Sequence, residues 1–260
     1  LLANARTHTP AGTRVETASA GDHVTILTNQ TPFYGESGGQ MGDSGTIAGD
    51  NGLSVTVEDT SKPLGRLHAH QAKVESGSIS VSQTVSLAID AERRDQIRAN
   101  HSATHLVHAA LRNRLGGHVT QKGSLVAADR FRFDFSHPTA LTPAEIADVE
   151  AAVNAQIRAN VPVTTRLMTP DDAIAAGAMA LFGEKYGDEV RVLTMGSEAY
   201  SVELCGGTHV NATGDIALFK IVSESAVSSG VRRIEALTGE AARLWLVERE
   251  GLLRDVAGAF

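Results

Sequence analysis

The sequence reads HSATH at residues 101–105, so His101 and His105 stand four residues apart inside a long helical pattern. Residues four apart on a helix lie one turn apart on the same face, and both imidazoles can therefore reach one ion. A second half follows in CGGTH, where Cys205, the only cysteine, precedes His209 by four residues. Three imidazoles and one thiolate suit tetrahedral Zn²⁺ better than Mg²⁺ or Ca²⁺. The two segments together predict one zinc site, which requires distant parts of the chain to meet.

Two simpler interpretations of these residues are weaker. A pair of histidines at helical spacing arises by chance in a chain with ten of them, and a lone cysteine is more often a small buried hydrophobic residue. The shared spacing favours ligation of one metal, as do Gly206 and Gly207, which place the second pair in a turn. HSATH also lacks the glutamate of the H-E-x-x-H motif, which disfavours a zinc peptidase.

Composition indicates a globular protein of a reducing compartment. The 260 residues are 42% hydrophobic, enough for one large core or two ordinary ones. One cysteine excludes an internal disulfide, and no stretch approaches the ~18 apolar residues of a membrane span, so we expect a cytoplasmic location and no membrane partner. The net charge of -7 argues against indiscriminate nucleic-acid binding but is compatible with a local basic stripe. The chain starts with leucine and ends in a helical pattern, which predicts a piece of a longer polypeptide.

Residues 1–90 show short alternating runs separated by turn residues, a pattern typical of strands in a small β-barrel or sandwich. The runs are residues 23–28, 53–59, 67–74 and 79–89. Residues 35–45 hold five glycines, which indicates a backbone that approaches something closely. No Gly-Lys-Ser/Thr follows, so a phosphate-binding P-loop is disfavoured, and an ordinary long connection is the alternative.

A helix is predicted over residues 91–115, ended by Gly116 and Gly117. At ~100° per residue, its polar side chains gather on one side, away from the main apolar face. These side chains are Arg94, Arg98, His101, His105, His108 and Arg112. Arginines above and below a metal could hold phosphates, which makes Arg94, Arg98 and Arg112 candidate RNA contacts. The alternative is a charged face that is merely solvated.

Residues 118–239 mix further strands and helices. Strict alternation in RFRFDF, residues 130–135, predicts a strand with an aromatic inner face. Thr142 and Glu145 form a capping box with Pro143 at the first helical position, which opens a helix to residue 160, and a shorter helix opens at Pro170. The other predicted strands are residues 163–168, 190–195, 201–204, 216–224 and 231–237. This order predicts an α+β sandwich over residues 91–239, followed from residue 240 by the start of an amphipathic helix.

Five motifs follow one another along the chain: HSATHLVHAAL, HVTQKGSLV, RFDFSH, ELCGGTHV and VRRIEALTG. Together they resemble the editing domain of alanyl-tRNA synthetases. The segment PFYGESGGQMGDSG, residues 32–45, resembles the glycine-rich stretch that precedes that domain, so the resemblance covers nearly the whole chain. It implies a translation-factor-like β-barrel over residues 1–90, a zinc-containing editing domain over 91–239, and the start of a C-terminal helix over 240–260.

The resemblance also implies an activity, hydrolysis of the ester in tRNA(Ala) wrongly charged with serine or glycine. The family's metal positions, for one Zn²⁺ per chain, fall on His101, His105, Cys205 and His209, and the two helical histidines would also serve catalysis. Its residue that contacts the misacylated amino acid falls on Gln121, for which a surface turn is the alternative. Gly206 and Gly207 would lie against the substrate. The implied partners are tRNA(Ala), the rest of a synthetase chain on both sides, and a second copy bound through a region beyond the C-terminal helix.

Chemistry explains why such a site is needed. An alanine pocket cannot exclude the smaller glycine and separates serine only modestly, so a second hydrolytic site is the expected remedy. Four protein ligands describe a closed structural zinc, whereas zinc that activates water keeps a position open. Either one ligand leaves in the working complex, or the metal mainly organises the pocket. Two other functions fit the sequence, a free-standing editing protein and a noncatalytic tRNA-binding module with a structural zinc.

Overall fold

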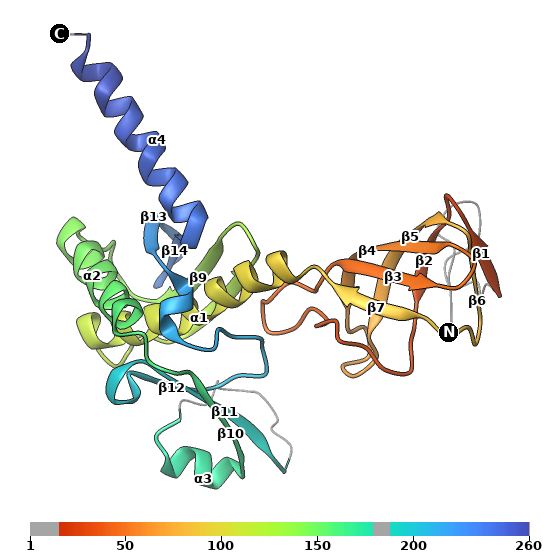
Figure 1. The fold of residues 1–260 in the computed structure, drawn as a ribbon. Helices are drawn as coiled ribbons and strands as arrows, with labels where there is room; N and C mark the ends of the chain where they lie inside the picture. Colours follow the sequence, from red (N-terminus) through yellow and green to blue (C-terminus); the bar gives the residue numbers. More distant parts are fainter. Residues whose placement is uncertain (1–15, 179–187, 260) are drawn as a thin grey trace. The chain divides into compact units, whose positions relative to one another are not determined.

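The computed structural model describes residues 16–178 and 188–259, and the chain divides into two compact units. The first unit reaches Arg94 and the second begins at Asp95. The boundary therefore falls near the start of helix α1, Ala91–Leu115. Figure 1 shows the elements of each unit.

The first unit is built on an antiparallel sheet of five strands in the order β2-β5-β4-β3-β7, accompanied by the pair β1-β6 (Figure 1). The strands are β1 Thr17–Ser19, β2 His23–Ile26, β3 Gly45–Gly49, β4 Leu53–Ser61, β5 Ala69–Ser76, β6 Ser78–Ser80 and β7 Ser86–Ile89. Along β4, Leu53, Val55 and Val57 enter the core while the residues between them are exposed, as period-2 alternation requires. Within the described residues the outer strands β2 and β7 do not pair with each other, so the predicted small barrel is not confirmed.

The strands of this unit differ in part from the predicted runs. The run over residues 79–89 forms two short strands, β6 and β7, because the chain turns between them with Ser82 at φ 66°. β1 and β3 were not predicted. β3 begins at Gly45, the last glycine of the glycine-rich segment, and pairs with both β4 and β7.

The glycine-rich segment of residues 35–45 packs closely on strand β4. A Cβ atom on Gly42 would lie only 1.9 Å from the carbonyl oxygen of Thr60. The next residue, Asp43, is 1% exposed and accepts hydrogen bonds from the backbone nitrogen of Tyr34 at 2.6 Å and from Nε of Arg94 at 2.8 Å. The predicted close approach of the backbone is therefore confirmed, and its target is the protein's own sheet.

The second unit combines two antiparallel sheets with helices, which confirms the mixed α+β class. One sheet has the order β13-β14-β9-β8 and the other the order β10-β11-β12. Their strands are β8 Gln121–Val126, β9 Phe131–Ser136, β10 Thr164–Met168, β11 Val190–Met195, β12 Ser201–Leu204, β13 Phe219–Ser228 and β14 Val231–Thr238. The helices after α1 are α2 Pro143–Ala159, α3 Pro170–Ala175 and α4 Gly239–Ala257, with 3₁₀ turns η1 Ser197–Ala199 and η2 Thr213–Ile216.

The core of this unit lies between α1, α2 and the inner face of the four-stranded sheet. Phe131, Phe133 and Phe135 alternate along β9 and are each 0% exposed, which confirms the predicted aromatic face. On the neighbouring strand β14, Ile234 pairs with Phe133 and is also fully buried. This packing fixes α1 against the sheet and thereby positions its histidines.

Helix α2 begins with the predicted capping box. The Thr142 hydroxyl accepts from the backbone nitrogen of Glu145 at 3.2 Å, and the Glu145 carboxylate accepts from the backbone nitrogen of Thr142 at 2.9 Å. Asn160 in the left-handed conformation ends the helix. The strand predicted from residue 216 begins only at Phe219, because η2 extends to Ile216 and Ala217 then takes a positive φ of 65°.

Helix α1 has the predicted bounds, but its polar side is not a solvated face. Every residue from 101 to 111 is buried, and His101, His105 and His108 are 7%, 7% and 4% exposed. Arg94 is buried as well. The interpretation of a solvated charged face is therefore wrong for this stretch, and the buried imidazoles require partners.

Helix α4 projects from the four-stranded sheet (Figure 1). It buries Ala242 near its start, whereas Leu244, Val247 and Leu253 are exposed. The helix predicted from residue 240 is thus confirmed. In the described ranges, no helix combines the length and the apolar character that crossing a bilayer demands.

Candidate metal centre

The two halves of the site are carried by the middle of α1 and by the end of β12. Helix α1 presents His101 and His105 on one side, with ring centroids 5.2 Å apart and the ring planes 22° apart. Strand β12 ends one residue before Cys205, whose backbone nitrogen still donates to the carbonyl of Arg191 on β11 at 3.0 Å. Sheet pairing therefore holds the cysteine, while the turn after it brings His209 back towards the helix.

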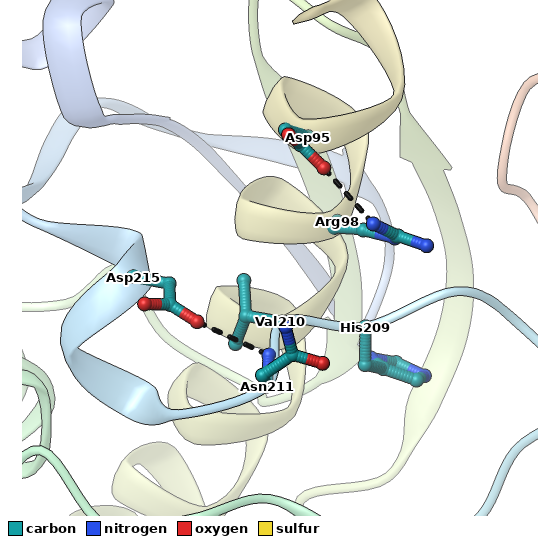
Figure 2. A pocket seen from close by; sticks show the side chains of 6 residues that line it. All are labelled: Asp95, Arg98, His209, Val210, Asn211 and Asp215. Carbon is teal, nitrogen blue, oxygen red and sulfur yellow. Dashed lines mark hydrogen bonds and ion pairs between the residues drawn. The ribbon is translucent and has the colours of Figure 1, made fainter. Parts of the chain in front are cut away.

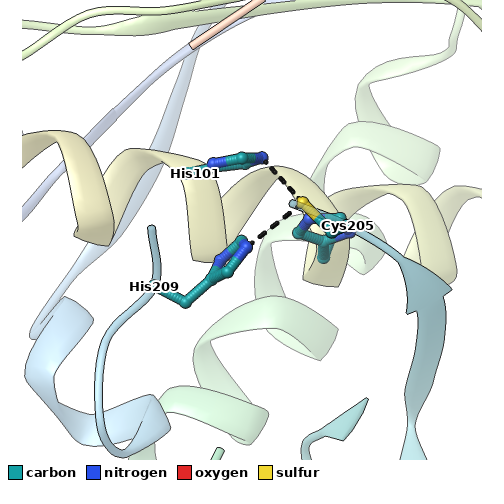
Figure 3. A group of neighbouring side chains, drawn as sticks. His101, Cys205 and His209 are labelled. Atoms are coloured by element: carbon teal, nitrogen blue, oxygen red, sulfur yellow. Dashed lines mark hydrogen bonds between the residues drawn. The ribbon is translucent and has the colours of Figure 1, made fainter. Parts of the chain in front are cut away.

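Histidines from both halves point to the sulfur of Cys205 (Figure 3). Its Sγ atom is 3.5 Å from Nε2 of His101 and 3.3 Å from Nε2 of His209. One potential ligand atom from each of His101, His105, Cys205 and His209 lies within 4.8 Å of the others. The fold thus brings together the four residues singled out by their spacing, and this cluster could hold a metal ion.

The Nε2 atom of His105 supports an ion at this position. It is buried, and within the described parts of the chain it has no hydrogen-bond partner. A buried polar atom left without a partner costs about 1–3 kcal/mol, a penalty that a metal bond would remove. One sulfur and three imidazole nitrogens are also a donor set that zinc prefers. The residues present therefore fit the ion that the spacing predicts.

The charges of the cluster also favour metal binding. Burial raises the pKa of Cys205, but the charge of His105 and hydrogen bonds from His101 and His209 outweigh it and lower the pKa to about 2. Burial lowers the pKa of His209 to about 3, and the neighbouring charge of His101 adds to this shift. At neutral pH the cysteine is therefore a thiolate and His209 a neutral imidazole, the forms that bind metals.

Glu203 belongs to the site but was not assigned from the sequence. It is 6% exposed on β12, and its carboxylate accepts from Nδ1 of His105 at 2.8 Å and from Nδ1 of His108 at 3.1 Å. Burial lowers the pKa of His105, but the charges of Glu203 and Cys205 outweigh it and raise the pKa to about 10. Burial raises the pKa of Glu203, yet the two histidines hold it well below its usual range. A signal was present in the sequence, because residues two apart on a strand share a face and Glu203 precedes Cys205 by two.

The turn after Cys205 is held by backbone groups. The Gly207 nitrogen donates to Sγ of Cys205 at 3.4 Å, and its carbonyl accepts from Nη1 of Arg191 at 2.5 Å. Gly207 is buried, whereas Gly206 is exposed, with open space where a Cβ would stand. Of the two glycines predicted to lie against substrate, Gly207 thus supports the thiolate and Gly206 is accessible.

The three arginines predicted to contact RNA lie in different surroundings. Arg94 is 7% exposed and its guanidinium pairs with Asp43 inside the first unit, so it is not available to a partner. Arg112 donates from Nη1 to the carbonyls of Gly117 and Val119 at 3.1 and 2.8 Å and so ties down the end of α1. The Arg98 side chain is 35% exposed and bonds Asp95 at 3.0 Å.

Gln121 occupies the first position of β8, where it pairs with Phe135 of β9. The side chain is half-buried, and its Nε2 donates to Oγ of Ser124 at 3.3 Å. The alternative of a surface turn at Gln121 is therefore wrong.

A cavity of about 370 Å³ opens beside the cluster (Figure 2). Its lining residues are Asp95, Arg98, His209, Val210, Asn211 and Asp215. The Asp215 carboxylate accepts from the backbone nitrogens of Asn211 and Ala212 at 3.1 and 3.0 Å, which shapes the wall. His209 belongs both to the cavity and to the cluster, so a molecule in the cavity would lie next to the metal position.

Two family models match the chain. The model of class II (A) tRNA synthetases matches residues 4–93, and that of the threonyl and alanyl tRNA synthetase second additional domain matches residues 190–235. The second match contains Cys205 and His209. Both models describe parts of class II aminoacyl-tRNA synthetases, so the chain contains segments of that class of protein.

Similar proteins narrow this class. Over 95% of its length the chain is 77% identical to the alanine–tRNA ligase of Sphingopyxis alaskensis, 71% identical to that of Rhizorhabdus wittichii and 60% identical to that of Granulibacter bethesdensis. It belongs to the alanyl-tRNA synthetase family. The chain spans only 28%, 29% and 29% of these relatives' respective lengths.

Proposed function

We propose that this chain carries a hydrolytic editing site, which removes serine or glycine from wrongly charged tRNA(Ala). The observation that carries the proposal is the convergence of three imidazoles and one thiolate beside a cavity. The match of residues 190–235 to the second additional domain supports it. The proposed ion is one Zn²⁺ per chain, and the proposed partners are the tRNA and the remaining parts of a synthetase.

The chemistry divides between the cluster and the groups around it. Zinc held by three neutral imidazoles and a thiolate would form a centre of net charge +1 that favours anionic oxygen nearby. Because four protein ligands complete a tetrahedral shell, other side chains must bind and orient the ester. The cavity beside His209 would take the terminal nucleotide of the tRNA, with Arg98 as the cation for its phosphate. Gln121 would meet the hydroxyl of a seryl group with its amide.

Deacylation of seryl-tRNA(Ala) by the purified chain tests this proposal. We expect ester hydrolysis, and we expect about one zinc per chain because the cluster offers a single tetrahedral ligand set. Cys205→Ala should lower both the rate of hydrolysis and the zinc content, since the soft thiolate ligand is lost. Ser54→Ala, on the exposed side of β4, is the control and should change neither.

Two results would contradict the proposal in different ways. A chain that binds zinc and tRNA but leaves seryl-tRNA(Ala) intact would support a noncatalytic tRNA-binding module, which the closed set of four ligands favours. Full retention of zinc by Cys205→Ala would remove the cysteine from the site and leave the ion to other residues.

A further inference from the structure

Glu203 uses each of its carboxylate oxygens for a different imidazole. Oε2 lies 2.8 Å from Nδ1 of His105, and Oε1 lies 3.1 Å from Nδ1 of His108. The Ser201 hydroxyl also donates to Oε1, at 3.2 Å. All four residues are buried, so water does not compete for these hydrogen bonds. The carboxylate of β12 thus holds two histidines that lie three residues apart on α1.

These contacts determine which nitrogen of His105 faces the metal position. An ionised carboxylate only accepts hydrogen bonds, so Nδ1 of His105 must carry a hydrogen. The other nitrogen, Nε2, then points to the cluster, where it is buried and lacks a hydrogen-bond partner among the described residues. If Glu203 did not hold the ring, the imidazole could turn or change tautomer and present the wrong atom.

Two other roles for Glu203 fit the contacts less well. As a metal ligand it would need an oxygen directed at the ion, but both oxygens are engaged by imidazoles, and the cluster of convergent ligand atoms does not include it. As a simple buried ion pair it would need only one histidine. The second imidazole, His108, is better explained as the group that locks the carboxylate in one orientation.

We propose that Glu203 is a positioning residue, whose carboxylate bridges Nδ1 of His105 and Nδ1 of His108 and so directs Nε2 of His105 to the metal. A carboxylate behind a metal-binding histidine typically changes metal affinity or activity by about 10- to 100-fold when it is removed. The link to ester hydrolysis rests on the proposed editing function, whereas the link to metal binding does not.

The decisive variant is Glu203→Gln, which keeps the size of the side chain but replaces one acceptor by a donor. We expect zinc affinity, measured by competition with a chelator, to fall by about 10- to 100-fold. The visible absorption of the Co²⁺-substituted protein should change, because the ligand field depends on how His105 is oriented. The kcat of Glu203→Gln for deacylation should fall, with little change in KM.

Glu150→Gln is the matched control in the same unit. Glu150 on α2 also uses both oxygens, for the backbone nitrogen of Ile221 at 2.8 Å and for Nζ of Lys220 at 2.9 Å, and neither partner belongs to the cluster. Its loss should lower thermal stability while zinc affinity and the cobalt spectrum stay unchanged. Equal loss of zinc affinity in both variants would reduce Glu203 to a structural role and overturn the proposal.

Substitutions at His108 test the bridge if Glu203→Gln does not fold. His108→Leu removes the second imidazole and should weaken zinc binding by a smaller factor than Glu203→Gln. His108→Asn, whose amide can donate in place of Nδ1, should restore most of the affinity. Wild-type zinc affinity in Glu203→Gln would refute the positioning role, and wild-type zinc affinity in His108→Leu would refute the bridge. If the unmodified chain fails to hydrolyse seryl-tRNA(Ala), the editing proposal fails, yet the affinities and the cobalt spectrum still decide the role of Glu203.

Discussion

The hydroxyl oxygen of Ser102 lies 3.2 Å from Nδ1 of His209 and joins the middle of α1 to the loop after Cys205. The same oxygen accepts a hydrogen bond from the backbone nitrogen of Val210 at 3.2 Å. For Nε2 of His209 to bind a metal, Nδ1 must carry the hydrogen, and Ser102 is the acceptor in reach. Ser102 is thus part of HSATH in sequence but supports the other half of the site.

Removing this hydroxyl should weaken metal binding. Ser102→Ala leaves Nδ1 of His209 and the Val210 nitrogen without their acceptor, so we expect zinc affinity to fall by roughly tenfold. Thr104→Val is the control, because its hydroxyl is also buried on α1 but donates to the carbonyl of Asn100 on the same helix, at 2.9 Å. Chelator competition on the two variants compares them directly. Equal affinities would show that Ser102 has no specific role.

Zinc binding at pH 8 should release about one proton, because metal ligands must be deprotonated. The pKa of His105 is raised to about 10, so the metal-free protein carries a proton on His105 that the ion must displace. The pKa values of Cys205 and His209 are lowered to about 2 and about 3, so these two ligands have already lost theirs. Zinc affinity should therefore rise with pH up to about pH 10.

Titration calorimetry in two buffers of different ionisation enthalpy measures the number of protons released. A value near two would mean that the thiol of Cys205 is protonated before the metal binds. A value near zero would mean that Glu203 does not keep His105 charged.

The metal cluster could be predicted from the sequence because its signals are local. Spacing alone places His101 and His105 on one face of a helix, and the short CGGTH turn brings Cys205 near His209. For Glu203 the sequence offered only its place two residues before Cys205, and for Ser102 no local signal of its partner, because the histidines they contact lie 98 and 107 residues away in the chain. Their roles depend on how β12 and the following loop meet α1, and the pattern of apolar residues does not encode that meeting.

In the first unit, too, contacts between distant segments could not be predicted from local patterns. Alternating residues predicted that strands exist there, but alternation does not specify which strands pair, so barrel closure could not be derived. Periodicity likewise placed Arg94 on the side of α1 that carries the histidines. Arg94 can be buried because its guanidinium pairs with Asp43, 51 residues earlier. No pattern in the sequence indicated that these two residues are partners.

Arg94→Met should destabilise the protein by about 3–5 kcal/mol, because it leaves a buried carboxylate without its partner. The side chains of Arg94 and Asp43 are 8% and 1% exposed. Adding Asp43→Asn should recover part of this loss, since the uncompensated charge is removed. Denaturant unfolding of the two single variants and the double variant gives the interaction free energy between the two side chains. Additive losses would show that the pair does not interact.

Arg98→Ala should weaken tRNA binding and reduce its dependence on salt. Each lost phosphate contact removes about one released counterion from the slope of log affinity against log salt. The matched control is Arg114→Ala on the same helix, whose side chain is 45% exposed and pairs with Asp148. Filter binding across a salt series measures both quantities. The same effect from Arg98 and Arg114 would indicate diffuse attraction and no specific contact at the cavity.

Gln121→Met should narrow the ratio of seryl to alanyl hydrolysis. Nε2 of Gln121 donates to Ser124, which leaves its amide oxygen as the acceptor for a seryl hydroxyl. An alanyl ester has no hydroxyl to offer, so its entry would leave that oxygen unsatisfied at a cost of about 1–3 kcal/mol, and this penalty protects the correct product. Met keeps the size of the side chain and removes the penalty. Lys122→Met, at the exposed neighbouring position, is the control.

Single-turnover deacylation of seryl-, alanyl- and glycyl-tRNA(Ala) measures the three rates. The glycyl rate should respond differently from the seryl rate, because glycine also lacks a hydroxyl and must be accepted by size. A seryl-to-alanyl ratio that is the same in Gln121→Met and the unmodified chain would exclude Gln121 from the amino-acid pocket.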